Sequence, residues 1–120
     1  MNELIDRLVA NTGVAAPVAE KAVGIILDFL RKEGPPDKVG ALLDKLPGAE
    51  PLLKAAGEQS GGMFGLGGIM GAANRLMGAG LSMGQVQSVT REVVAFARDK
   101  AGEDAVGEVV GAIPGLSQFV

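Results

Sequence analysis

The chain has 120 residues, a mass of 12.1 kDa and a formal net charge of −3, from 11 basic and 14 acidic side chains. It contains no His, Cys, Trp or Tyr. These absences exclude the usual zinc sites, a thiol nucleophile and a histidine general base, and together with the acidic balance they argue against nucleic acid as a partner. An apolar fraction of 48% lets the chain bury a core, and the length fits one domain over 1–120.

Residues 1–53 predict three helices, which run from Asn2 to Gly13, from Pro17 to Gly34 and from Pro36 to Pro47. Proline suits the first turn of a helix, whereas glycine and proline after the last turn stop it. The apolar residues recur at spacings of three and four, which is typical of helices buried along one side. These predicted core residues are Leu4, Ile5, Leu8, Val9, Val18, Ala22, Ile25, Ile26, Phe29, Leu30, Val39, Leu42, Leu43 and Leu46.

Residues 68–120 repeat this plan. Ser82 and Gln85 have the spacing of a capping box, Gly102 ends the helix that follows, and Pro114 stops the last one. No segment alternates apolar and polar residues as a strand does, so the predicted fold class is all-α. The predicted core residues of these two helices are Val86, Val89, Val93, Phe96, Ala97, Val106, Val109, Val110 and Ile113.

An internal repeat relates the two halves. Sliding the sequence against itself by 67 residues, without a gap, aligns Phe29 with Phe96 and the Pro-Gly pair at 47–48 with that at 114–115. We expect a small helical bundle of two pseudo-symmetric three-helix repeats, about 1–53 and 68–120, joined by a Gly-rich linker at 54–67. Since neither half is long enough to bury much apolar area alone, the halves are expected to share one core. The same arrangement permits swapping of halves between chains, so we expect a homo-oligomer.

The Gly- and Met-rich centre is the most unusual segment, with Met63, Met70 and Met77 spaced seven apart. Methionine stripes suit adaptable contact surfaces, so a partner groove, a lipophilic pocket and a soft-metal site are all open, beside a plain linker followed by a loosely packed core helix. The residues of this candidate partner or ligand surface are Met63, Phe64, Leu66, Ile69, Met70 and Met77, with Arg75 as an isolated cation.

Arg75 is the only charged residue between 59 and 90. It is a candidate anion clamp, although an arginine on an apolar helix often extends its head to solvent instead. The glycines at 65–71 miss the dinucleotide pattern because Met70 holds the third glycine position, so we expect no cofactor. No serine has a predicted general base, and we expect no catalytic residues and no metal.

The N-terminus lacks the basic start and apolar run of a secretory signal, so the expected location is the cytoplasm. The low-charge centre is interrupted by Arg75 and rich in glycine. A membrane span of about 20 apolar residues is therefore not expected.

The Pro-Gly stops in LPGAEPLL and IPGLSQFV, the GLGGIM centre and the helix ending in DFLRKEG resemble a small bacterial family, the VcgC/VcgE-type domain of unknown function, and more loosely the YidB-like proteins. The resemblance implies a small helical bacterial protein with no established activity and no functional residues to transfer.

We therefore expect a non-enzymatic helical protein that acts by protein–protein contact or self-association. The alternative is a carrier of a small lipophilic ligand, held in a Met/Gly-lined cavity between the repeats. Reversible binding to a membrane surface is a third possibility, but the apolar segment lacks a flanking basic face.

Overall fold

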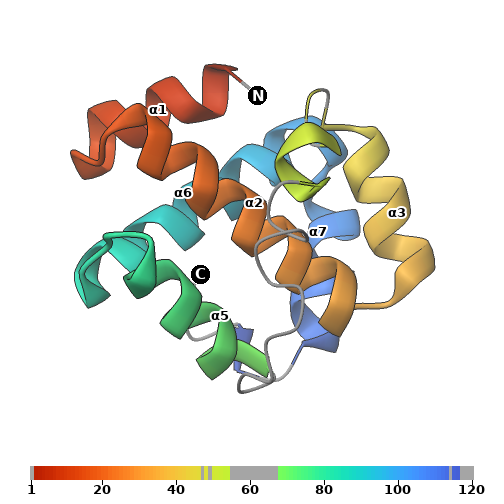
Figure 1. The fold of residues 1–120 in the computed structure, drawn as a ribbon. Coiled ribbons are helices and arrows are strands. Elements are labelled where there is room, and N and C mark those ends of the chain that lie inside the picture. Colours follow the sequence, from red (N-terminus) through yellow and green to blue (C-terminus); the bar gives the residue numbers. More distant parts are fainter. Residues whose placement is uncertain (1, 47, 49, 55–67, 114, 117–120) are drawn as a thin grey trace.

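The computed structural model describes residues 2–46, 48, 50–54, 68–113 and 115–116, and within these residues all regular structure is helical. This confirms the predicted all-α class. The helices are α1 (Asn2–Thr12), α2 (Ala16–Glu33), α3 (Pro36–Asp44), α5 (Gly68–Gly78), α6 (Met83–Ala101) and α7 (Glu103–Ala112), with a further helical turn at 50–54 (Figure 1).

Local sequence explains where these helices begin and end. Pro17 lies in the first turn of α2, and α3 starts at Pro36. The predicted capping box of α6 is confirmed, because the Ser82 hydroxyl accepts from the Gln85 backbone N–H at 3.2 Å and the Gln85 side chain accepts from the Ser82 N–H at 3.0 Å. Gly102 ends α6 with a φ of 96°, a left-handed conformation that favours glycine.

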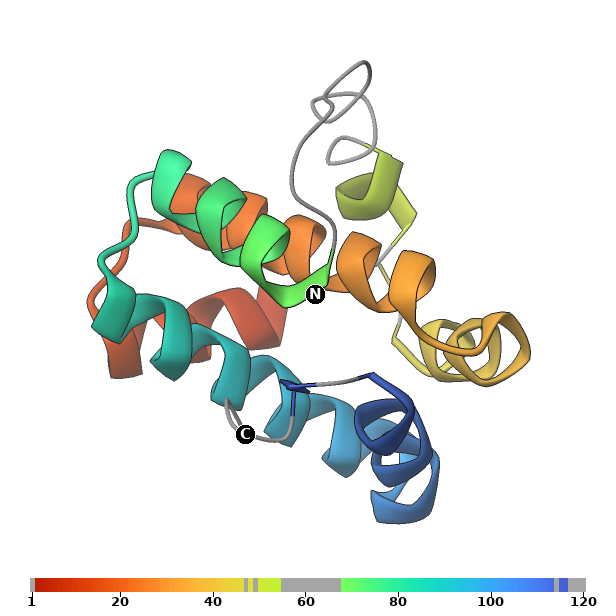
Figure 2. The ribbon, with the colours of Figure 1, turned by 90° about the horizontal axis from the view of Figure 1, so that it is seen from below.

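The two longest helices, α2 and α6, form the centre of the molecule and contact each other. Helix α1 packs on both of them, and so does α5 (Figures 1 and 2). Helices α3 and α7 contact each other at the end where α2 and α6 terminate, whereas the short connections at 13–15 and 79–82 lie side by side at the opposite end (Figure 2). This arrangement buries the apolar stripe of each helix against at least one other helix.

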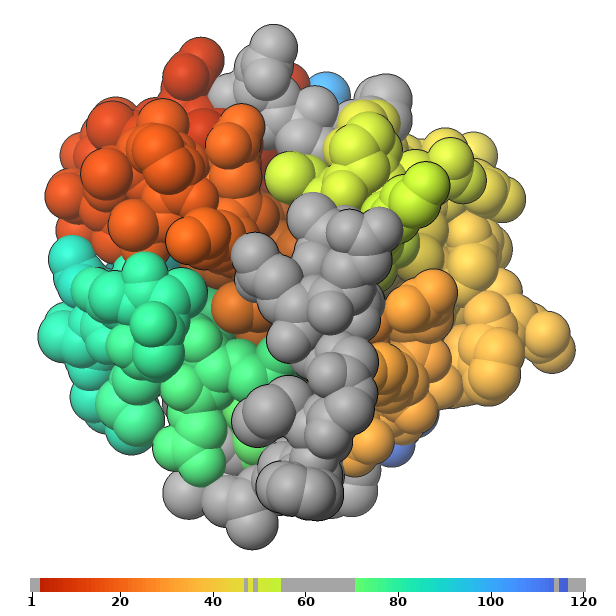
Figure 3. Space-filling view, in the orientation of Figure 1, coloured from red at the N-terminus to blue at the C-terminus, as the bar shows by residue number. Residues whose placement is uncertain are grey.

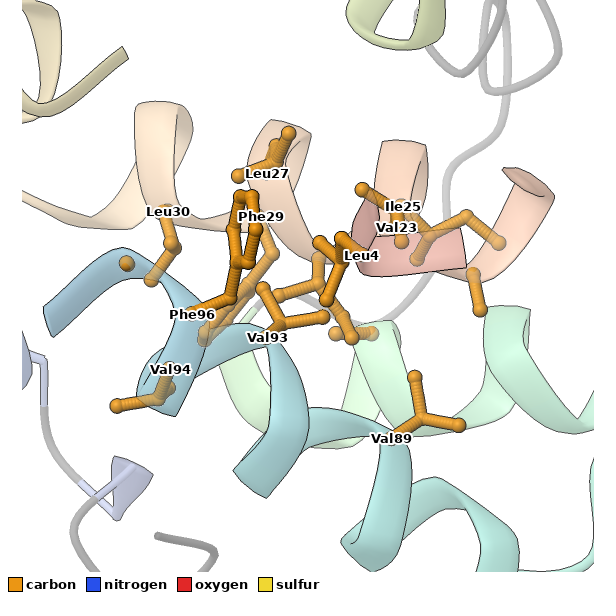
Figure 4. Packing of buried hydrophobic residues seen from close by; sticks show 14 of the residues in the cluster. Leu4, Val23, Ile25, Leu27, Phe29, Leu30, Val89, Val93, Val94 and Phe96 are labelled. Atoms are coloured by element: carbon orange, nitrogen blue, oxygen red, sulfur yellow. The ribbon is translucent and has the colours of Figure 1, made fainter. Parts of the chain in front are cut away.

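One hydrophobic core joins the helices of both halves. Phe29 of α2 and Phe96 of α6 lie in the space between these two helices, beside Leu4 and Val93 (Figure 4). Nearly all the predicted core residues are buried or half-buried, but Val9 is 39% exposed. The prediction for Val9 was wrong because α1 buries a narrow face, and Val9 lies at the edge of that face.

The predicted linker at 54–67 lies outside the described residues, apart from Lys54, which ends the helical turn at 50–54.

Candidate functional site

The structure separates the residues of the predicted contact surface. Met63, Phe64 and Leu66 lie outside the described residues. Ile69 and Met70 belong to the first turn of α5, but their side chains are likewise outside the description. The side chains of Met77 and Arg75 are described, and they lie in different surroundings. Met77 is exposed, whereas Arg75 forms an ion pair with Asp28.

Met77 lies in the last turn of α5 and is 39% exposed. The described large hydrophobic side chains with comparable exposure are Val9, in the last turn of α1, and Met83, the first residue of α6, at 48%. All three belong to elements that meet where the 13–15 and 79–82 connections run side by side (Figures 1 and 2). The Gln85 side-chain amide donates to the Thr12 carbonyl oxygen across this region at 3.4 Å. We call the surface formed by residues 8–19 and 76–90 the uncharged end.

The uncharged end contains no ionisable side chain. No Asp, Glu, Lys or Arg occurs between Arg7 and Glu20, or between Arg75 and Arg91. The fold brings these two segments together, and their surfaces adjoin at the left edge of Figure 3, red-orange above and green to teal below. The exposed positions here are alanine, glycine, proline and small polar residues around the three large hydrophobic ones.

Arg75 faces the interior of the molecule. Its Nη1 atom donates to Oδ2 of Asp28 on α2 at 3.1 Å, and the Asp28 side chain has no exposed surface. Arg31 and Lys32, one turn further along α2, reach the same carboxylate at 2.9 and 3.1 Å. The anion that Arg75 holds is therefore a carboxylate of the chain itself, and the pair joins α5 to α2.

This cluster controls the ionisation of Asp28. Burial alone would raise the pKa of its carboxyl, but the hydrogen bonds from Arg31, Lys32 and Arg75 outweigh burial and hold the pKa below its ordinary value of 3.8. Asp28 is therefore charged at neutral pH. Among the described residues, every buried side-chain nitrogen or oxygen has a hydrogen-bond partner.

Sequence reasoning did not select Asp28. A local signal exists, since Arg31 and Lys32 follow it at the i+3 and i+4 positions of one helix. The same spacing is common on exposed helix faces, so it does not predict burial. The partner that makes the site a tertiary one, Arg75, is 47 residues away in the chain.

A small apolar cavity lies between the two halves, where α5 covers α2 and α6. Its volume is about 20 Å³, roughly the space that one water molecule needs. Neither methionine nor glycine lines it within the described part of the chain. The lining residues are Ile26, Phe29, Ala72, Ala73, Leu76, Val86, Thr90 and Leu116.

The described residues contain no cluster of acidic side chains that could hold a metal ion. None of their helices combines the length and the apolar character that crossing a membrane requires.

Comparisons with known protein families, with curated proteins and with solved structures give no match for this chain. The resemblance to the VcgC/VcgE-type domain and the YidB-like proteins stays a prediction.

Proposed function

We propose that this chain is a non-enzymatic helical protein built from two related three-helix halves, 1–53 and 68–120, and that it acts by contact with a second copy of itself through the uncharged end. The observation that carries the functional part is the exposure of Val9, Met77 and Met83 in two uncharged segments that the fold brings together. The proposed repeat matters here because it explains why two uncharged segments meet at the same end.

The order and limits of the helices support the repeat. Helices α1, α2 and α3 start at residues 2, 16 and 36, and α5, α6 and α7 start at 68, 83 and 103. The separations are 66 to 67 residues, close to the offset found in the sequence. Glycines with positive φ recur at the same offset, at Gly13 and Gly80 and again at Gly48 and Gly115.

The packing between the halves is reciprocal, as a two-fold relation requires. Helix α1 of the first half packs on α6 of the second, and α5 of the second packs on α2 of the first. Each of these contacts includes an ion pair from an arginine, Arg7 to Glu92 at 3.4 Å and Arg75 to Asp28 at 3.1 Å. The self-related pairs α2 with α6 and α3 with α7 also contact each other.

The match between α1 and α5 improves when the offset there is 68 instead of 67. Buried residues then align with buried residues, the two arginines align, and the equally exposed Val9 and Met77 become equivalent. The stretch from Met77 to Gly80 is one residue shorter than the stretch from Val9 to Gly13, which restores the offset of 67 at Gly13 and Gly80. The aligned pairs are Leu4 with Ala72, Ile5 with Ala73, Arg7 with Arg75, Leu8 with Leu76 and Val9 with Met77.

A second copy is the partner that the charge pattern favours. Each chain carries a net charge of −3, so two copies repel each other at long range, and a contact between them has to avoid the charged side chains. Contact through the uncharged end leaves the charged side chains in water and buries the most exposed large hydrophobic residues of the described surface. A strongly charged partner would gain no ion pair from this surface.

Native mass spectrometry and analytical ultracentrifugation of the untagged protein test the proposal. We expect a dimer for the natural chain. The double variant Met77→Glu/Met83→Glu places four carboxylates in the contact, and we expect it to weaken the dimer at least tenfold, while circular dichroism shows unchanged helicity. Ala41→Glu is the matched control, because Ala41 is exposed on α3 at the opposite end of the molecule.

The control variant is expected to remain a dimer. A natural chain that is monomeric at high micromolar concentration contradicts the proposed self-association. A double variant that dimerises as well as the natural chain contradicts the assignment of the uncharged end as the contact surface.

A further inference from the structure

The cavity between α2, α5 and α6 differs in chemistry from the uncharged end. Its lining is aliphatic and aromatic except for Thr90, whose hydroxyl donates to the Val86 carbonyl oxygen at 2.8 Å. This lining holds no charged group. A water molecule in the cavity would lack the two or more partners that keep buried water in place. The lining favours an apolar occupant.

The cavity exists because α5 carries small residues. If the proposed repeat holds, Ala72 and Ala73 are the equivalents of Leu4 and Ile5, which are buried where α1 packs on α2 and α6. Leu4 is fully buried there. Each alanine side chain has about three carbons fewer than its counterpart, so the two together lack about six, the carbon content of a benzene ring.

Helix α5 is the wall that must move for the cavity to widen. It contains Gly68, Gly71 and Gly78, which lower helix stability. The Arg75–Asp28 ion pair holds α5 to α2 next to the cavity, since Leu76 and Phe29 follow these two residues and line it. The remainder of the cavity wall belongs to α2, α6 and Leu116, which are packed into the core.

We infer that this cavity is a binding site for a small uncharged hydrocarbon group of about the size of benzene, and that α5 shifts outward to admit it. The inference rests on the proposed repeat but not on the proposed self-association. The resting volume of about 20 Å³ is well below the roughly 150 Å³ that holds benzene in an engineered cavity, so binding requires this shift.

Benzene itself is the probe. We expect it to raise the melting temperature of the natural chain by about 3–6 °C at ten times its dissociation constant. Two-dimensional NMR of methyl groups is expected to show shifts at Ala73, Leu76 and Val86, and none at Val9 on the uncharged end. The variant Met77→Glu/Met83→Glu is expected to bind benzene as the natural chain does, which separates this result from the fate of the dimer.

Filling the cavity is the decisive variant. Ala73→Leu is expected to occupy the space that opens when α5 shifts and to abolish the response to benzene, whereas Ala41→Leu on the exposed face of α3 keeps the response. Should Ala73→Leu fail to fold, Ala72→Val adds less volume at the same wall and is expected to weaken binding at least tenfold.

The inference is overturned if benzene leaves the melting temperature and the methyl shifts of the natural chain unchanged. It is also overturned if Ala72→Val or a folded Ala73→Leu responds to benzene as strongly as the natural chain.

Discussion

At the scale of the residue, the Asp28 carboxylate is held by three cationic side chains. This carboxylate is fully buried, yet two of its three cationic partners are about half exposed. Water screens the exposed partners, so their contribution is smaller than the short distances suggest. Arg75, the partner on another helix, is the one that gives the cluster a tertiary role.

The ion pairs predict how stability depends on pH. The pKa of Asp28 is lower in the folded chain than in the unfolded chain, so the unfolded chain binds the proton first as the pH falls. The stabilisation by Asp28 is therefore present above the ordinary pKa of 3.8 and is lost as the pH falls through the folded pKa. Asp28→Asn is expected to cost about 1–3 kcal/mol at pH 7.

Denaturant unfolding of the natural chain and Asp28→Asn across pH 2–7 measures this effect. The difference between the two free energies of unfolding is expected to shrink below about pH 4, because the protonated aspartic acid then resembles the asparagine. Taking the difference cancels the other carboxyl groups. A gap that stays constant over this range would show that the charge of Asp28 does not stabilise the fold.

At the scale of the element, the connection between α2 and α3 depends on a close approach at Gly34. A Cβ atom there would lie 2.8 Å from the Leu30 carbonyl oxygen and 2.8 Å from Cγ2 of Val39. The Gly34 N–H also donates to the Leu30 oxygen, which ends α2. The tight packing of α3 on the end of α2 therefore requires glycine at this position.

Gly34→Ala is expected to destabilise the protein by about 1–3 kcal/mol, because the backbone must move to relieve the contact. Gly40→Ala is the matched control. Gly40 lies within α3, and a Cβ atom there would meet nothing within 4 Å. The control is expected to stabilise the protein by about 0.5–1 kcal/mol, since alanine is the better helix former. Thermal unfolding measures both, and equal effects of the two variants would contradict the close approach at Gly34.

At the scale of the whole molecule, the ion pairs between distant parts of the described chain all join one half to the other. These pairs are Arg7 with Glu92 and Asp99, Glu3 with Lys100, Lys38 with Glu108 and Asp28 with Arg75. The core is continuous across the same boundary. Each half therefore gains much of its buried surface from the other.

Separate fragments 1–54 and 68–120 test this dependence. Neither fragment is long enough to bury a sufficient core alone, so each is expected to show weak helicity in water. When the fragments are mixed, the helical circular dichroism signal is expected to exceed the sum of the separate signals. A mixture that only gives the sum would show that the halves do not complete each other. Mixing the fragments in about 1 M salt distinguishes core packing from the surface ion pairs, because salt screens the ion pairs.

The sequence by itself determined most of the helices and several of their limits, although it did not predict the helical turn at 50–54. Apolar spacing, the Ser82 capping box, the prolines at the starts of α2 and α3, and glycine at the ends act within a few residues, so they are readable in a single chain. It also indicated Met77 as a surface residue, as part of a longer apolar segment. The exposure of Val9 was missed because a periodic stripe does not reveal how wide a face the neighbouring helices cover.

Only the tertiary structure decided where the ion-pair cluster, the uncharged end and the cavity lie. It brought Arg75 to Asp28, placed the two uncharged segments at one end, and left a cavity where Ala72 and Ala73 face α2 and α6. Each of these features joins residues that are far apart in the chain. Local propensity does not specify which helix faces meet, because that depends on the packing of the whole core.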